Sequence, residues 1–169
     1  MEELQNLSSV LIGLRKGQAI LPQSVVVESL PYATPLRIEN APPWVVGAIL
    51  WRARTTPLVS LETLIEGSRT DPGARSRIVV LNALGNDPKL PNYCILGTEM
   101  PQSISLRRSE IVIDEEEILR PEGVLAHVRI NNEEGIIIPN LDFIEEVLSQ
   151  VMRRKSLTHY DFRRSESSL

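Results

Sequence analysis

The sequence predicts a mainly β protein built from small barrels, with short helices and a helix near its carboxyl end. Short apolar runs recur at near-regular spacing along the 169 residues, and turn-forming residues separate them. This pattern is typical of small β-barrels rather than of a wound α/β sheet. The composition, 42% hydrophobic and 24% charged, is that of one globular domain with a core of its own.

The first predicted element is a hairpin. Residues 9–14 and 18–22 are apolar runs separated by Arg15-Lys16-Gly17, where the glycine favours a tight turn. The β-branched run Val25-Val26-Val27 predicts the next strand. We expect the proline-rich segment 31–43 to be an irregular loop, because proline lacks a backbone N–H and fixes φ.

Two further strands are expected at 45–50 and 56–59, joined through Arg52-Ala53-Arg54. A short helix fits 60–67, because a serine can cap its first turn, apolar residues follow at helical spacing, and a glycine ends it. The segment 68–76 is rich in Ser, Asp, Pro, Gly and Arg, which predicts a loop.

The second half of the chain repeats the strand pattern and closes with a helix at 140–155. Its N-cap is either Asn140 or a capping pair of Asp142 and Glu145. We expect the domain to span residues 7–150 and residues 151–169 to be the helix end and a loose polar tail. The further strands are predicted at 77–81, 92–96, 103–106, 111–113, 125–130 and 135–138.

Charge and targeting signals exclude several classes of protein. The net charge of −4 does not favour a broad electropositive face, so nucleic acid is not an expected partner. The amino end lacks the order of a secretion signal, and one cysteine forms no intramolecular disulfide. We therefore expect a cytoplasmic protein that reaches a membrane only through a partner.

The sequence carries none of the specific catalytic motifs that bind phosphate, activate a serine or ligate zinc. His127 is expected to be a half-buried strand residue rather than a general base, and His159 lies in the predicted tail. Cys94, among apolar neighbours, is expected to pack rather than react. The acidic run 114–117 is more typical of a solvated face than of a cation site. No catalytic residue, cofactor or metal is therefore expected.

Arg52 and Arg54 interrupt the apolar run 44–61. At alternate positions of an extended segment the two side chains would point to the same side. Burying either guanidinium group without a partner would cost several kcal/mol. Each arginine must therefore face water, pair with a carboxylate or bind a partner protein. An exposed hairpin tip is an equally good interpretation of the two arginines.

The order of these segments resembles the bacterial CheW-like family of chemotaxis adaptors. The resemblance runs through Val26-Val27-Glu28, Pro42-Pro43-Trp44, Val46 to Arg52 and Thr56 to Leu61, and it closes at Glu134 to Leu141. It covers about residues 7 to 150. Three positions depart from the family pattern, where Leu50 replaces an asparagine, Ala53 a glycine and Ser60 an aspartate. Within the family, the chain is similar to ChpC-type members, which serve type IV pili and twitching.

The resemblance implies two packed five-stranded SH3-like barrels. It also implies a non-catalytic adaptor that couples the cytoplasmic tip of chemoreceptors to the regulatory domain of a CheA-type histidine kinase. A decoy that binds receptors without the kinase is the first alternative. A small enzyme with its site between the lobes is the second.

The resemblance also implies which residues bind partners. Residues matching Val26, Glu28, Gly47 and Arg52 are linked in the family to partner binding or to the groove between lobes. We expect Glu28 and Arg52 to form an ion pair that fixes this groove, and Gly47 to permit a close backbone approach. The remaining candidates are Arg54 and Trp51, the latter as an interface anchor or a core residue, whereas Trp44 is expected to pack in the core.

Overall fold

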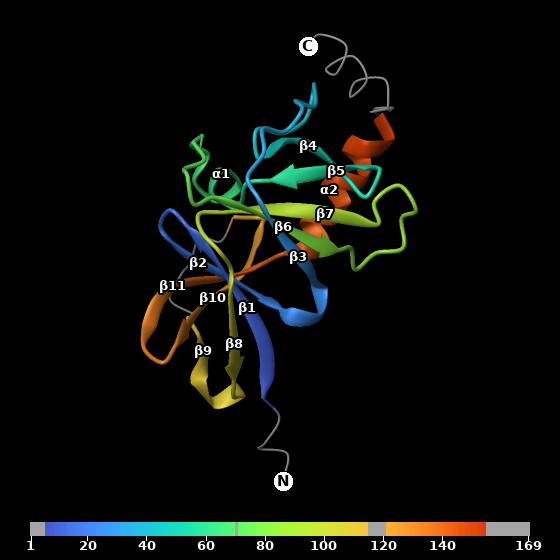
Figure 1. Cartoon of the computed structure of the whole chain (residues 1–169). Coiled ribbons are helices and arrows are strands. Elements are labelled where there is room, and N and C mark those ends of the chain that lie inside the picture. Colours follow the sequence, from blue (N-terminus) through green and yellow to red (C-terminus); the bar gives the residue numbers. More distant parts are fainter. Residues whose placement is uncertain (1–5, 70, 115–120, 155–169) are drawn as a thin grey trace.

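The computed structural model describes residues 6–69, 71–114 and 121–154, in which the chain forms eleven strands and two α-helices (Figure 1). The acidic residues 115–117 lie outside the described residues, as do residues 155–169, which comprise the last residue of the predicted helix and the predicted tail with His159. From the amino end, the strands are β1 (Leu7–Leu14), β2 (Gly17–Pro22), β3 (Val26–Pro31), β4 (Val45–Trp51), β5 (Arg54–Val59), β6 (Arg77–Asn82), β7 (Asn92–Gly97), β8 (Gln102–Leu106), β9 (Ile111–Ile113), β10 (Val124–Ile130) and β11 (Glu133–Pro139).

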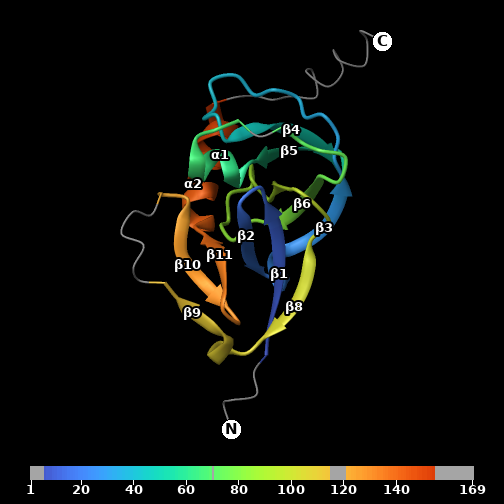
Figure 2. The same ribbon diagram turned by 90° about the vertical axis from the view of Figure 1, so that its left-hand side faces the viewer.

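The strands form two sheets. One has the order β8-β1-β2-β11-β10-β9, and the other has the order β3-β6-β7-β5-β4. We call them the first lobe and the second lobe; the first lies below the second in both views (Figures 1 and 2). The predicted mainly β fold in two barrel-like lobes is confirmed. The first lobe has six strands rather than five, because the three-residue β9 pairs with β10.

Both faces of the central strands are buried, which explains why these strands are continuous apolar runs in the sequence. In β6, Ile78 and Val80 face the second-lobe core, which also contains Trp51 and Cys94. The alternate residues Val79 and Leu81 face a larger shared core. The shared core draws residues from both lobes and from the carboxyl-terminal helix, among them Ile12, Leu21, Tyr93, Ile95 and Leu148.

The first helix, α1 (Leu61–Glu66), begins and ends as its sequence predicts. Ser60 Oγ accepts a hydrogen bond from the Thr63 backbone N–H at 3.2 Å, and Gly67 ends the helix with a φ of 73°. A residue with a side chain is disfavoured at that φ, so glycine is the natural stop.

The second helix, α2 (Leu141–Arg154), is capped by Asn140, whose side-chain oxygen accepts from the Phe143 backbone N–H at 3.1 Å. This decides between the two predicted caps. Glu145 is buried instead, and its carboxylate accepts from the Leu84 and Gly85 backbone N–H groups and from the Tyr93 hydroxyl at 3.0, 2.8 and 2.9 Å. It therefore holds the loop after β6 against the helix.

Polar contacts join the lobes at the β1–β2 turn. The Arg15 backbone N–H donates to the Glu62 carboxylate of α1, and Lys16 Nζ lies 3.9 Å from Glu66 Oε1. The Thr98 backbone N–H donates to the Gly13 carbonyl at 3.0 Å. The first-lobe hairpin therefore contacts both α1 and the chain that leaves the second lobe.

Candidate partner-binding site

Arg52 and Ala53 form the two-residue turn between β4 and β5, with φ values of 47° and 63°. Positive φ at both central residues is typical of hairpin turns that match the right-handed twist of their strands. Arg54 is already the first residue of β5, where it pairs with Trp51. The expected extended segment through Arg52 and Arg54 is therefore wrong, and the two exposed arginines occupy a hairpin tip.

Trp51 connects this tip to the second-lobe core. Its side chain is buried with 8% exposure, and its indole N–H donates to Glu28 Oε1 at 2.5 Å. The Arg52 guanidinium carbon lies 4.3 Å from the centroid of the Trp51 ring, within the range of a cation–π contact. The structure thus places Trp51 in the core, with the exposed Arg52 against its ring.

The expected ion pair between Glu28 and Arg52 is not formed among the described residues. Glu28 accepts from the indole of Trp51, while Arg52 lies over the ring of the same residue. The left-handed conformation of Arg52 accounts for the difference, because it directs the chain into the turn rather than along the strand. Trp51 therefore connects the two charged residues indirectly.

Gly47 and Trp44 hold the proline-rich loop and α2 against β4. A Cβ atom on Gly47 would lie 2.3 Å from the Leu36 carbonyl oxygen, so the expected close backbone approach is confirmed. Leu36 pairs with Ala48 through two backbone hydrogen bonds of 2.9 and 2.8 Å, an isolated bridge in the otherwise irregular segment 32–43. Pro31, which was expected in this loop, is instead the last residue of β3 and pairs with Arg77. Trp44 is buried 6.2 Å from the Phe143 ring, as its expected core role requires.

Val26 is half-buried and packs against the shared core, where β3 carries an irregularity opposite β6. Of the residues predicted to bind partners, Gly47 and Trp51 are therefore buried, Val26 and Glu28 are half-buried, and Arg52 and Arg54 are exposed. The structure brings Glu28, Trp51 and Arg52 together at one end of the second lobe.

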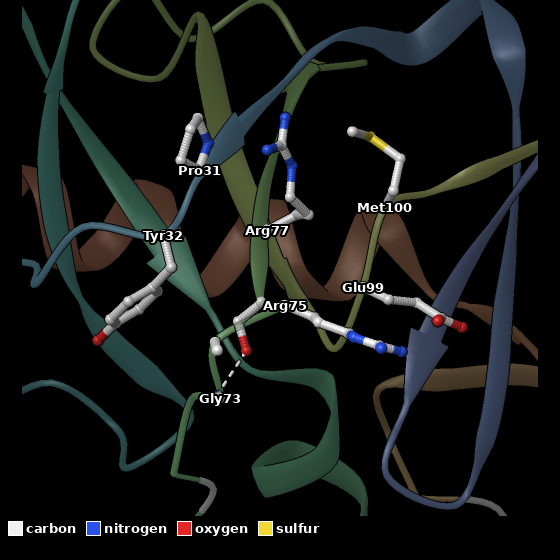
Figure 3. Close-up of a pocket in the computed structure, with 9 residues that line it drawn as sticks. Pro31, Tyr32, Gly73, Arg75, Arg77, Glu99 and Met100 are labelled. Carbon is white, nitrogen blue, oxygen red and sulfur yellow. Dashed lines mark hydrogen bonds between the residues drawn. The ribbon is translucent and has the colours of Figure 1, made fainter.

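A groove of about 610 Å³ lies between three segments that are distant in the sequence (Figure 3). It is bounded by the end of β3, by the loop that leads into β6, and by the linker between β7 and β8. This linker connects the second lobe to the first. Sequence reasoning missed it. The residues that line it include Pro31, Tyr32, Arg75, Arg77, Glu99 and Met100.

The groove combines fixed positive charge with exposed apolar surface. Arg77 donates from Nε and Nη2 to the hydroxyl and the carbonyl of Ser29, both at 3.0 Å, which fixes its guanidinium on β3. Met100 is 61% exposed, and in Figure 3 it lies across Arg77 from Tyr32. The Arg75 side chain extends toward Glu99. Such a surface suits a protein segment better than a small molecule, which needs a more enclosed site.

Three titratable side chains of the described residues, those of Cys94, Tyr93 and His127, are buried or half-buried in the strands. Cys94 is fully buried, and burial raises the pKa of its thiol to about 12, so it is protonated at neutral pH. Burial, together with Glu145, raises the pKa of Tyr93. His127 is half-buried in β10, as expected. Within the described ranges, no group of three or more His, Cys, Asp or Glu side chains gathers to hold a metal.

The described residues thus form two barrel-like lobes with an exposed arginine hairpin and an open groove. The model of the CheW-like domain family matches residues 8–145. The chain therefore belongs to the CheW-like domain family, whose character as a non-catalytic scaffold supports a role as a chemotaxis adaptor.

A solved structure shares this fold. The crystal structure of the scaffolding protein TtCheW from Thermoanaerobacter tengcongensis matches with a TM-score of 0.66 and 17% sequence identity, over 81% of this chain and 86% of that chain. No curated protein matches the sequence. In the part of the chain that the structure describes, neither helix has the length and apolar character needed to span a membrane.

Proposed function

We propose that this chain is a chemosensory adaptor that couples chemoreceptors to a CheA-type histidine kinase and catalyses no reaction itself. The observation that carries the proposal is the family match over residues 8–145, which takes in strands of both lobes. The exposed hairpin tip and the groove supply two separate surfaces, as an adaptor with two partners requires.

The groove binds the cytoplasmic tip of the receptor. Because the groove is open, is bounded by three chain segments and exposes Met100, it suits a helical partner whose apolar side chains would cover the methionine. Arg75 and Arg77 would face acidic residues on that partner.

The hairpin tip binds the regulatory domain of the kinase. Arg52 and Arg54 are exposed there beside Leu50, which is 48% exposed. Arginine is enriched at protein interfaces, and here two exposed arginines follow an exposed apolar side chain in the same hairpin. Because β3 carries both Glu28, at the hairpin, and Pro31, at the groove, it links the two surfaces.

Coupling follows if the adaptor binds one state of the receptor–kinase assembly more tightly than the others, because a ligand shifts an equilibrium only by its differential affinity. The adaptor then acts in the cytoplasm and reaches the membrane only through its receptors. More specifically, we propose that the chain serves a chemosensory system that controls type IV pili, as ChpC-type members do.

The test is separate co-purification of the chain with a receptor cytoplasmic tip and with a kinase regulatory domain. Arg52→Glu should weaken kinase binding at least tenfold, and Met100→Asp should weaken receptor binding by a similar factor. Arg129→Glu and Leu125→Asp, which alter exposed residues of β10, are the matched controls. Circular dichroism verifies that each variant is folded.

Each outcome has a distinct meaning. Binding to both partners, with each variant affecting its own partner, supports the adaptor. Binding to the receptor alone identifies the decoy. Binding to neither partner at tens of micromolar contradicts the proposal.

A further inference from the structure

A second, smaller cavity of about 200 Å³ adjoins the groove, with which it shares Gly73 and Ser76. Its walls come from α1 and its N-cap, from the loop after α1, and from the end of β7. The polar side chains that line it away from the groove are those of Ser60, Glu62, Asp71 and Thr98.

Glu62 gives this cavity its chemical character. The residue is 8% exposed, and one carboxylate oxygen accepts from the Arg15 backbone N–H. No hydrogen-bond partner reaches the other oxygen, Oε2, within the residues that the structure describes, although that atom is buried. A buried carboxylate oxygen without a partner is unfavourable, so a group that pairs with it would bind with a gain in free energy.

The other lining groups favour a cation. Asp71 adds a second carboxylate, the Thr98 hydroxyl adds an oxygen atom, and no lysine or arginine is among the described residues of the wall. The volume exceeds that of one water molecule, about 30 Å³, several times over. It therefore has room for an ammonium or guanidinium group together with part of an alkyl stem.

We propose that this cavity binds the cationic end of a lysine or arginine side chain. The side chain belongs to the protein segment that occupies the adjoining groove, and in this respect the inference rests on the proposed function. Glu62 pairs with the cation, and Asp71 contributes charge from the exposed side of the wall. The partner of the groove then carries a basic residue next to the apolar side chains that cover Met100.

The test needs no protein partner, so its failure is distinct from a failure of the proposed function. The chain is titrated with n-butylammonium chloride and, separately, with n-propylguanidinium chloride at constant ionic strength. The backbone amide signals of Arg15 and Thr98 are followed by NMR. Both signals should shift and saturate at millimolar concentration, and n-butanol, which has the same stem without the charge, should leave them in place.

Glu62→Gln should weaken this binding at least tenfold. The matched control is Glu66→Gln, four residues along the same helix, which should leave the binding unchanged. Asp71→Asn alters an exposed residue and should weaken binding severalfold, so it tests the proposal even if Glu62→Gln fails to fold.

Three results would overturn the proposal. The first is the absence of any shift with either organic cation. The second is equal binding by wild type, Glu62→Gln and Asp71→Asn. The third is a response to magnesium or calcium chloride alone, which would identify a metal site in place of a side-chain pocket.

Discussion

Trp51 donates its indole N–H to Glu28, and this hydrogen bond joins the two edge strands of the second lobe. Glu28 lies in β3 and Trp51 ends β4, and the two strands occupy opposite ends of the five-stranded sheet. The contact therefore helps to close the sheet into a barrel, at the place where the exposed Arg52 lies over the indole ring.

Glu28→Ala should destabilise the second lobe. The substitution leaves the buried indole N–H of Trp51 without its acceptor, which costs about 1–3 kcal/mol of unfolding free energy. Glu28→Gln keeps an acceptor at the same place and should cost less. Urea denaturation, followed by tryptophan fluorescence, measures both. Equal stability of Glu28→Ala and wild type would mean that the hydrogen bond does not stabilise the closed barrel.

Ala53→Gly should stabilise the protein. Ala53 has a φ of 63°, and the left-handed conformation costs an alanine about 1–2 kcal/mol, a cost that glycine does not bear. We expect a gain of about 1 kcal/mol in thermal or chemical unfolding. Ala33→Gly, at an exposed loop position without a positive φ, is the control and should bring no gain. A loss of stability in Ala53→Gly would show that the turn is not strained.

Glu145→Ala should be more destabilising than Tyr93→Phe. The first substitution leaves two backbone N–H groups and a buried hydroxyl without their acceptor, whereas the second removes one of three hydrogen bonds. Tyr93→Phe should cost about 1–2 kcal/mol and Glu145→Ala about 3 kcal/mol or more. Hydrogen exchange of the Leu84 and Gly85 amides checks the mechanism, because both should exchange faster in Glu145→Ala. Equal destabilisation by the two variants would contradict this order.

Alkaline pH should weaken the fold in part through Cys94. Burial raises the pKa of its thiol from 9.0 to about 12, so the unfolded chain loses this proton at a lower pH than the folded chain does. The contribution of Cys94 is therefore complete below pH 9 and falls as the pH rises toward 12, by at most about 1.4 kcal/mol per pH unit.

The comparison of wild type with Cys94→Ala isolates this contribution. The difference between their unfolding free energies should shrink above pH 9 and stay constant below it. Parallel stability curves across this range would contradict the prediction. In the folded protein, Cys94 should also react slowly with a thiol reagent at pH 8, because the side chain is buried as well as protonated.

Elements with a local signal could be predicted from the sequence. The strands of the second half follow their apolar runs closely, and Ser60 and Gly67 mark the ends of α1 through capping that acts over three or four residues. The conformation of the β4–β5 turn is harder to predict from the sequence, because Arg52-Ala53 lacks the asparagine and glycine that usually indicate positive φ. Its conformation comes from the pairing of the strands that it joins.

Most of the candidate site could not be predicted in this way. The Glu28–Trp51 bond joins residues 23 positions apart, and only the closed barrel brings them together. The groove takes Tyr32, Arg77 and Met100 from three segments whose local patterns are those of ordinary loops and strands. The resemblance to a family suggested candidate positions, but it left open whether Trp51 is an interface anchor or a core residue, and only the structure shows that its side chain is buried.

The division of the chain between the lobes has a consequence for biosynthesis. The second lobe is continuous from β3 to β7, whereas the first joins the amino-terminal hairpin to β8 through β11. On the ribosome, all strands of the second lobe have therefore been synthesised once the chain reaches Gly97. The first lobe is completed later, because β11, the partner strand of β2, ends only at Pro139. Until then β2 can pair only with β1, and its second edge, which pairs with β11 in the finished fold, is open to other strands.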